Sequence, residues 1–366
     1  MERIAVNVAW PYANGPVHVG HMAGSLLPPD IFARYHRMRG NRVLMVSGSD
    51  QHGTPITLEA EKEGLKPEEV AEKYHELNQK SIEWMQIEFD IYTKTHTENH
   101  KEVVQKFFTA LQDAGYLYTR KTNQYFCVKD NRFLADTYVR GTCPKCGFED
   151  ARGNQCEICG TTFEAGELLN PICIICGNPT ILRETENVFF ALSSLSGRLS
   201  EYLSDKNYWR PAVFDFTKNW LASGLTDRAV TRDLEWGIPV PVAGMENKVI
   251  YVWFEAVIGY LSASIEWAKR RGKEEAWKEF WTEPGAKHYY FLGKDNIPFH
   301  SIIWPAMLLA HGGLNLPHDV VANQYLNAPG GFKFSKSRGG APTIEVLSSF
   351  LDAEHLRYYL TSVMPE

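Results

Sequence analysis

Hydrophobic and polar positions near the start of the chain alternate between strand-like and helix-like stretches. Residues 4–9 form an apolar run that predicts a buried strand, and a turn rich in proline and glycine follows at residues 11–16. A helical pattern begins near His21 and extends to residue 38, and residues 42–46 form a second apolar run. Pro67 stands where another helix would begin. Strand, helix, strand, helix is the order typical of a doubly wound parallel sheet.

The middle of the chain has a different residue pattern. Cysteines and glycines crowd residues 122–180, where long helical periods are absent, and residues 184–242 carry short aromatic stretches. The alternating pattern then returns, with strands expected at 248–253, 287–292 and 320–321 and helices at 255–269 and 299–310. The sequence therefore predicts an α/β protein whose sheet is interrupted by a small inserted module.

Composition changes this picture little. Of the 366 residues, 44% are hydrophobic and 22% charged, which is enough apolar content for a sizeable core. We find no run of about 18 apolar residues and no signal-peptide pattern at the N-terminus, so we expect a cytoplasmic protein with no membrane partner. The net charge of −6 argues against a dedicated nucleic-acid binder, but an enzyme that meets RNA at one basic face would still fit.

The strongest chemical signal is a pair of CxxC motifs. Cys143 and Cys146 are followed, after nine intervening residues, by Cys156 and Cys159. Four thiolates at this spacing form a ligand set for tetrahedral zinc, and four protein ligands leave no open coordination position. The motifs predict a structural zinc site. The alternative is four buried cysteines that hold no metal.

A second metal site is suggested by a less regular pattern. Cys173 and Cys176 form a third CxxC pair, and Cys127 is followed three residues later by Asp130. Aspartate can ligate zinc, so these four residues could form a second knuckle. The alternative is a degenerate knuckle with free thiols.

Two further motifs carry candidate chemistry. His18, Gly20 and His21 form an HxGH motif between the first expected strand and the first helix, where an open α/β sheet binds ligands. Imidazole donors at this position suit a phosphate that gains charge in a transition state. Lys333 and Lys336 belong to the segment KFSKS, which glycine pairs flank on both sides, so we expect a mobile basic loop. Either motif alone is weak evidence of function, and their pairing at opposite ends of one α/β chain is more informative.

HxGH and KFSKS resemble the HIGH and KMSKS signatures of class I aminoacyl-tRNA synthetases. The cysteine module, together with AWPYANG (residues 9–15), GSDQHGT (48–54) and WFEAVIGY (253–260), resembles the methionyl-tRNA synthetases in particular. The resemblance covers essentially the whole chain. Phe334 departs from the usual methionine of KMSKS, but both lysines are kept.

The resemblance implies a division of the chain into four parts. Residues 1–121 would form the first half of a Rossmann-type catalytic domain, residues 122–230 an inserted connective domain with zinc knuckles, and residues 231–325 the second half of the catalytic domain. Residues 326–366 would hold the KFSKS loop and the start of a stem-contact region. The family also has a helical anticodon-binding domain, so we expect this sequence to be a truncated form.

The implied reaction is that of a methionine–tRNA ligase. Methionine and ATP would give methionyl-adenylate and pyrophosphate, and the methionyl group would pass to the 3′ end of tRNA(Met). The resemblance makes His18, His21, Lys333 and Lys336 catalytic, and it places His18, Gly20, His21, Gly293, Asp295 and Lys336 on ATP, which Mg²⁺ would accompany. Asp50 would bind the methionine ammonium, and the remaining pocket residues would be Ala9, Trp10, Tyr12, Trp253, Ala256, Tyr260, His300 and Trp304.

Two other functions fit parts of the sequence. One is a free-standing enzyme that adenylates an amino acid without using tRNA. The other is a zinc-ribbon nucleic-acid module fused to an inactive nucleotide-binding scaffold. Retention of His18, His21, Asp50 and Lys336 argues against the second, since an inactive scaffold has no use for all four.

Overall fold

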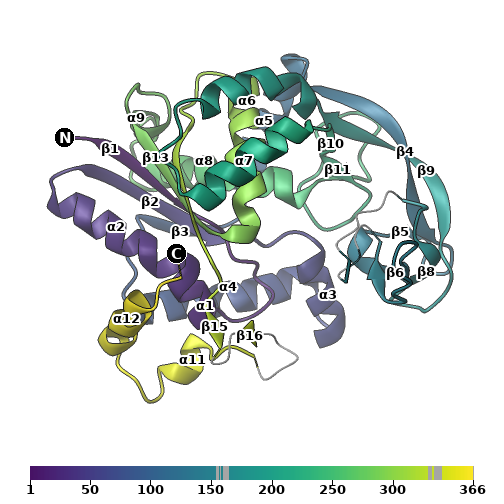
Figure 1. Cartoon of the computed structure of the whole chain (residues 1–366), viewed down its shortest axis with the longest axis horizontal. Helices are drawn as coiled ribbons and strands as arrows, with labels where there is room; N and C mark the ends of the chain where they lie inside the picture. The colour runs from purple at the N-terminus through teal and green to yellow at the C-terminus, as the bar shows by residue number, and fades with distance from the viewer. Residues whose placement is uncertain (154–155, 157, 160–164, 329–331, 334–339, 366) are drawn as a thin grey trace. The chain divides into compact units, whose positions relative to one another are not determined.

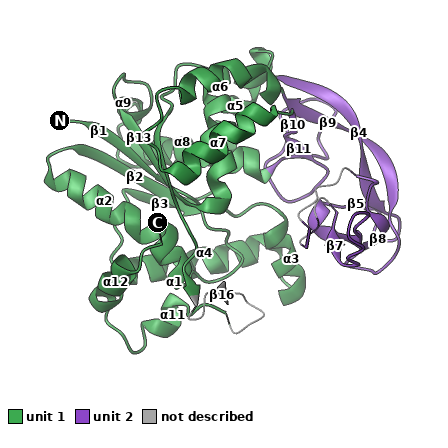
Figure 2. Ribbon diagram, viewed as in Figure 1, with its two compact units in different colours: residues 1–116, 191–226, 252–366 green, residues 117–190, 227–251 purple. Residues whose placement is uncertain are grey.

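The computed structural model describes residues 1–153, 156, 158–159, 165–328, 332–333 and 340–365 (Figure 1). The chain divides into two compact units, which Figure 2 colours separately. Unit 1 comprises residues 1–116, 191–226 and 252–366, and unit 2 comprises residues 117–190 and 227–251. These bounds differ from the expected inserted domain at 122–230. Residues 191–226 contain two helices that pack within unit 1, whereas residues 231–251 complete the strands of unit 2.

Unit 1 is built on a five-stranded parallel sheet. Its strands are β1 (Arg3–Val8), β2 (Arg42–Ser49), β3 (Ile91–Lys94), β13 (Lys287–Gly293) and β14 (Pro317–Asn323), in the order β14-β13-β1-β2-β3. In β1 the five residues after Arg3 are all buried, as expected for a strand covered on both faces. The predicted doubly wound sheet is thus confirmed.

The strand order reverses at β1, which pairs with β2 on one side and β13 on the other. Chain connections leave in opposite directions at such a point, so a crevice opens at the carboxyl ends of the strands. Ala9 follows β1, Asp50 follows β2 and Lys294 follows β13, so these residues meet at one edge of the sheet.

Helices surround this sheet within unit 1 (Figure 1). The longer ones are α2 (Leu27–Met38), α3 (Thr54–Glu63), α4 (Pro67–Trp84), α5 (Glu98–Asp113), α6 (Ser196–Leu203), α7 (Pro211–Ser223), α8 (Val252–Arg270), α10 (Trp304–His311) and α12 (Ala353–Ser362). Short helical segments are α1 (Val19–His21), η1 (Met22–Leu26), η3 (Leu192–Leu195), α9 (Lys278–Trp281), η4 (Lys294–Asn296), η5 (Phe299–Ile303) and α11 (Ile344–Leu347). Pro67 occupies the first position of α4, as predicted, where its missing N–H costs no helical hydrogen bond.

One expected strand of the central sheet is absent from it. The apolar run 248–253 contains only the two-residue strand β12 (Val249–Ile250), which pairs with β11 (Thr231–Arg232) in unit 2. The helix α8 already begins at Val252, so Trp253 is helical. Short apolar runs fit a buried strand and a buried helix start equally well, and periodicity alone could not separate them.

Unit 2 consists mainly of antiparallel strands. The long strands β4 (Leu117–Cys127) and β9 (Ile181–Phe190) pair over ten residues, and β5 (Arg132–Phe133) and β10 (Arg228–Ala229) lie at the two edges of their sheet. A smaller sheet has the order β7-β6-β8, from β6 (Val139–Thr142), β7 (Ala151–Arg152) and β8 (Leu169–Cys173), and η2 (Asp136–Tyr138) precedes it. Among the described residues, no helix is both long and apolar enough to cross a lipid bilayer.

Two buried histidines should make the fold sensitive to acid. Burial lowers the pKa of His288 and of His300 from the ordinary 6.5 to about 4. The unfolded chain therefore takes up these protons below pH 6.5 while the folded chain stays neutral, so stability falls as the pH drops from 6.5 towards 4. We expect a loss of about 2 kcal/mol per histidine between roughly pH 6.5 and pH 5, measured by urea unfolding. His288→Gln should flatten the profile, and a wild-type profile without this slope would contradict the prediction.

Candidate active site

A cavity of about 440 Å³ opens at the carboxyl edge of the sheet in unit 1. Residues from both ends of the chain line it. The lining residues are Ala9, Trp10, Pro11, Tyr12, His18, Gly20, His21, Gly24, Ser25, Asp50, Trp253, Ala256, Val257, Tyr260, Gly293, Asp295, Asn296, Phe299, His300, Gln324, Tyr325 and Leu326. Most of the residues that the sequence analysis singled out for methionine and ATP therefore border one cavity.

The HxGH motif lies at the start of the helical segment that leads into α2. His18 is the N-cap of α1, and its Nδ1 accepts a hydrogen bond of 3.1 Å from the Gly20 N–H. His21 Nδ1 accepts a bond of 3.2 Å from the His18 N–H, and the two ring centroids are 3.9 Å apart. Because Nδ1 is an acceptor in both rings, the neutral tautomer carries its hydrogen on Nε2. The backbone thus prepares two Nε2–H donors at the cavity.

Asp50 supplies a buried carboxylate to the same cavity. Its backbone N–H donates to the Pro11 carbonyl at 2.9 Å, and its own carbonyl accepts from Ala13 N–H at 2.8 Å, so the residue is tied to the segment after β1. Burial, and secondly the charge of Glu255, raise the pKa of Asp50 well above its ordinary value, and a hydrogen bond from the His52 N–H opposes them. No lysine or arginine side chain in the described part of the chain forms an ion pair with Asp50. The site is therefore suited to a cationic ligand group.

An aromatic wall stands beside Asp50. Trp253 stacks on Phe299 with centroids 4.1 Å apart, and Tyr12 meets Trp253 edge-on at 6.1 Å. Trp10 lies in a slot between Gly48 and Gly259. A Cβ at Gly48 would come within 2.3 Å of the indole, and one at Gly259 within 2.9 Å. Both positions therefore need glycine for Trp10 to reach this place.

Tyr260 and His300 form a fixed pair in the wall. His300 Nδ1 lies 2.9 Å from the Asn296 carbonyl, which can only accept, so Nδ1 carries the hydrogen. His300 is neutral at pH 7, so its Nε2 accepts and the Tyr260 hydroxyl donates to it over 2.7 Å. The Tyr260 oxygen then presents its acceptor side to other groups, in an otherwise apolar wall.

Trp304 is not among the residues that line the cavity, so its place in the methionine wall stays a prediction. It is completely buried, and its indole N–H donates to the Tyr290 hydroxyl at 2.8 Å. Its ring packs against Phe107 and Trp281 instead. Trp304 begins α10, directly after the π-turn η5 that carries His300.

The far end of the cavity follows β13 and β14. Gly293 and Asp295 border it, and the Tyr325 hydroxyl donates to the Asp295 carboxylate. The ammonium of Lys294 lies 4.5 Å from the centroid of the Tyr325 ring. Hydroxyl, carboxylate and backbone groups gathered here suit the polar face of a nucleoside.

The described segments that flank KFSKS adjoin residues that line the cavity, although most of the loop lies outside the described residues. Lys333 is described only through its backbone, which belongs to β16 (Phe332–Lys333) and pairs with β15 (Asn327–Ala328), while Lys336 lies outside the described residues. After the loop, the Pro342 carbonyl accepts from Val19 N–H at 3.2 Å, and Ile344 N–H donates to the Val17 carbonyl at 3.3 Å. The described end of the loop is thus bonded to the backbone on both sides of His18.

Sequence reasoning missed several lining residues. Gly24 and Ser25 belong to η1, and Phe299 belongs to η5; both elements are π-turns within longer helical segments. Such turns are frequent at functional sites, but a 3.6-residue periodicity does not reveal them. The stretch 324–326 was missed because the expected strand at 320–321 was too short to place its carboxyl end.

Both predicted groups of metal ligands come together in unit 2. Cys143, Cys146, Cys156 and Cys159 form one group and Cys127, Asp130, Cys173 and Cys176 the other, with ligand atoms within 4.8 Å of one another in each. The Sγ–Sγ distances in the first group include 3.8 Å and 3.6 Å. Four sulfurs at tetrahedral zinc are about 3.8 Å apart, given Zn–S bonds of about 2.3 Å. None of the seven cysteines is in a disulfide.

Comparison with known proteins identifies the class of this fold and site. A family model described as "tRNA synthetases class I (M)" matches residues 4–366, and the chain belongs to this family. Two similar curated proteins are both methionine–tRNA ligases. That of Thermomicrobium roseum is 53% identical over 366 residues, covering 100% of this chain and 62% of the relative. That of Thermoplasma acidophilum is 48% identical over 364 residues, covering 100% of this chain and 66% of the relative. The chain thus spans less than two thirds of these relatives.

Solved structures agree on the fold. Methionyl-tRNA synthetase of Mycobacterium tuberculosis, bound by methionyl-adenylate, matches with a TM-score of 0.74 at 23% sequence identity. The match covers 98% of this chain and 64% of that one. A second complex of the Mycobacterium tuberculosis enzyme with methionyl-adenylate gives a TM-score of 0.75 at 24% identity.

Proposed function

We propose that this chain is the catalytic part of a methionine–tRNA ligase. It would activate methionine with ATP, giving methionyl-adenylate and pyrophosphate, and then transfer the methionyl group to the 3′ end of tRNA(Met). The observation that carries the proposal is a single cavity in which a buried carboxylate and an aromatic wall adjoin a histidine pair and the ends of β13 and β14. Membership of the class I family and the similarity to methionine–tRNA ligases support it.

The amino-acid end of the cavity suits methionine. Asp50 would pair with the α-ammonium, and Ala9, Trp10, Tyr12, Trp253 and Ala256 would surround the side chain. Aromatic rings attract a polarizable thioether sulfur by about 0.3–1.5 kcal/mol. The Tyr260 hydroxyl donates to His300, and the His300 Nδ1–H donates to the Asn296 carbonyl. This pair therefore directs neither of its hydrogen-bond donors at the methionine side chain.

The other end of the cavity suits ATP. The Nε2–H groups of His18 and His21 would donate to phosphate oxygens, and Gly20 would let the nucleotide approach the backbone. Gly293 and Asp295 would contact the adenosine. Lys333 and Lys336 would approach the phosphates as negative charge develops there, with Mg²⁺ accompanying ATP. The protein would thus act by positioning and charge stabilisation, with the methionine carboxylate as the nucleophile on the α-phosphate.

An exchange assay tests the proposed activation step. The chain should incorporate labelled pyrophosphate into ATP when methionine is present and not with the other nineteen standard amino acids. Charging of tRNA(Met) tests the transfer step separately. Exchange that depends on a different amino acid, or none with any of them, would refute the proposal. Since translation uses tRNA in the cytoplasm, we also propose that location.

We further propose that unit 2 holds two structural zinc ions, one in each ligand group. Metal analysis should find two equivalents of zinc per chain. Cys143→Ser and Cys173→Ser should each lower this to one, because each removes a ligand from a different group. The two variants serve as controls for one another. Since structural zinc supplies roughly 10 kcal/mol or more of folding free energy, a strong chelator should unfold unit 2. Loss of both ions in either variant would argue against independent sites.

A further inference from the structure

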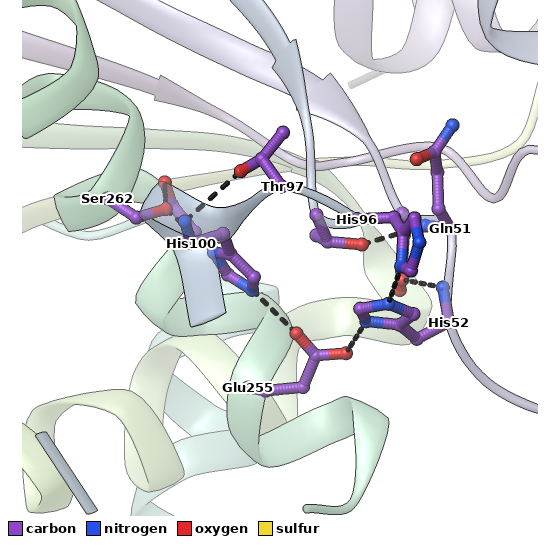
Figure 3. A network of polar contacts seen from close by, with 10 residues as sticks. Gln51, His52, His96, Thr97, His100, Glu255 and Ser262 are labelled. Carbon is purple, nitrogen blue, oxygen red and sulfur yellow. Dashed lines mark hydrogen bonds and ion pairs between the residues drawn. The ribbon is translucent and has the colours of Figure 1, made fainter. Parts of the chain in front are cut away.

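A buried carboxylate outside the cavity joins three elements of unit 1. Glu255 in α8 is completely buried, and each of its oxygens meets a different imidazole. Oε1 lies 2.8 Å from His52 Nδ1, and Oε2 lies 2.6 Å from His100 Nε2. Figure 3 shows the two rings converging on the carboxylate from opposite sides. His52 follows β2 and His100 lies in α5, so the cluster ties both segments to α8.

Complete burial of the Glu255 carboxylate is energetically unfavourable by itself. A buried carboxylate costs several kcal/mol in lost hydration, and an apolar residue at this helix position would avoid that cost. Burial opposes ionisation of Glu255, but the two imidazoles outweigh it and lower its pKa to about 2. Glu255 is therefore held as an anion, although the cavity lining does not include it.

Glu255 is linked through a single residue, His52, to Asp50, the proposed ammonium-binding residue. His52, which bonds Glu255 through its ring, also donates its backbone N–H to Asp50 Oδ1 at 3.2 Å. On the other side, Glu255 is followed directly by the cavity-lining Ala256. The bond between His52 and Glu255 thus connects the segment after β2, which carries Asp50, to the part of the cavity lining that belongs to α8. His100 contacts the same carboxylate, and its ring centroid is 6.4 Å from that of Trp10, which lines the cavity.

We propose that Glu255, held by His52 and His100, is a positioning residue that fixes Asp50 relative to the aromatic wall and keeps its carboxylate poised for an incoming ammonium group. The inference rests on the proposed function in taking methionine as the ligand. Its geometric part is the fixed spacing between Asp50 and the aromatic wall. Its electrostatic part is that a second buried anion makes ionised Asp50 unfavourable until a cation arrives.

The electrostatic part predicts a proton release. Burial and the charge of Glu255 raise the pKa of Asp50, so this carboxyl takes up a proton more readily in the free protein than an exposed aspartate does at the same pH. When the ammonium binds, Asp50 loses its proton to the buffer and the carboxylate–ammonium pair forms, so one bound proton is exchanged for one cation. The number of protons released should rise as the pH falls, because more Asp50 is then protonated beforehand.

Several other titratable groups lie near Asp50 and Glu255. Tyr260 of α8 faces Asp50, and His52 and His100 face Glu255. One step further, His52 Nε2 lies 3.1 Å from His96 Nδ1, and Ser262 Oγ contacts His100 Nδ1 at 2.7 Å. The groups that face His96 in turn are Glu68, Glu72 and Lys94.

Substitution of Glu255 tests the proposal in the full chain. Glu255→Gln should raise the methionine KM in pyrophosphate exchange by more than about tenfold while the KM for ATP changes less than about twofold. Glu255→Asp keeps the charge and should recover part of the loss. Glu266→Gln is the matched control, because Glu266 lies on the same helix and bonds only Thr93 and Arg270 in the described structure. It should leave both constants unchanged.

Calorimetry in buffers of different ionisation enthalpy gives the second readout. Wild-type protein should release more protons on binding methionine as the pH is lowered from neutrality. Binding of 4-methylthiobutanoate, which lacks the amine, should release none, and Glu255→Gln should release fewer with methionine. A purely structural role would instead lower the thermal midpoint of Glu255→Gln and leave its methionine KM and proton count unchanged, which would overturn the proposal.

The outcomes separate this inference from the proposed activity. Methionine binding with proton release but without pyrophosphate exchange would refute the activity and leave the inference standing. Pyrophosphate exchange with an unchanged methionine KM in Glu255→Gln would support the activity and refute the inference. If Glu255→Gln does not fold, Glu255→Asp decides, since a methionine KM equal to that of the wild type despite the shorter side chain would contradict the positioning role of Glu255.

Discussion

Asp50→Asn should lower methionine-dependent pyrophosphate exchange by about 10²–10³-fold, almost entirely through weaker methionine binding. The substitution keeps the size and shape of the side chain but removes its charge. A ligand ammonium would then be buried without a counter-ion, which costs about 3–5 kcal/mol, and about 1.4 kcal/mol corresponds to each factor of ten in affinity. Calorimetric titration with methionine, together with exchange at saturating ATP, measures both quantities.

Stability gives this experiment a second expectation. Because Asp50 is buried without an ion pair in the described structure and its pKa is raised, the free protein should tolerate asparagine well, or even be stabilised by it. Asp319→Asn is the matched control, since burial also raises the pKa of Asp319 in the same unit, away from the cavity. It should leave methionine affinity unchanged. An Asp50→Asn protein that binds methionine normally would remove Asp50 from the ammonium site.

Much of the sheet could be predicted because its strands are buried on both faces. The runs at 4–9, 42–46 and 287–292 consist mainly of apolar and aromatic residues, and each corresponds to a strand of the parallel sheet. The same logic placed the HxGH motif at the carboxyl edge of the sheet, where an open α/β sheet binds ligands. Asp50 and Asp295 were named only through the family resemblance.

Backbone irregularity accompanies the lining residues that the sequence did not predict. The two π-turns, η1 and η5, each contribute residues to the cavity lining. Gly24 and Ser25 line the cavity from the first, and Phe299 lines it from the second. Hydrophobic periodicity is nearly the same with and without one wider turn, so the sequence carried no signal for either π-turn.

The role of Glu255 was hidden for a different reason. In the sequence it is one acidic residue inside the helical pattern at 255–269, where a charge usually marks a solvated face. Only the fold brings His52 and His100 to it, from positions 203 and 155 residues away along the chain. Pairings between residues so far apart depend on sheet topology, which local patterns do not specify in detail.

Lys336→Ala should slow adenylate formation by about 10²–10³-fold while methionine affinity stays the same. Additional negative charge develops on the pyrophosphate group as it leaves, so a lysine that meets this group at that moment lowers the barrier more than it strengthens ground-state binding. Lys336 lies outside the described residues, and the expectation rests on the family motif and on the flanks of its loop. Val19 N–H and the Val17 carbonyl hold the following segment at Pro342 and Ile344, beside His18.

Single-turnover measurement of adenylate formation, with methionine affinity from calorimetry, separates the two effects. Lys80→Ala is a suitable control, because Lys80 is an exposed residue within α4 and alanine suits a helix at least as well. It should change neither quantity. If Lys336→Ala instead weakened methionine binding and left the single-turnover rate intact, the lysine would act on the bound ground state. The idea that the KFSKS loop and the histidine pair act on one nucleotide would then fail, because Lys336 would contribute nothing where charge develops.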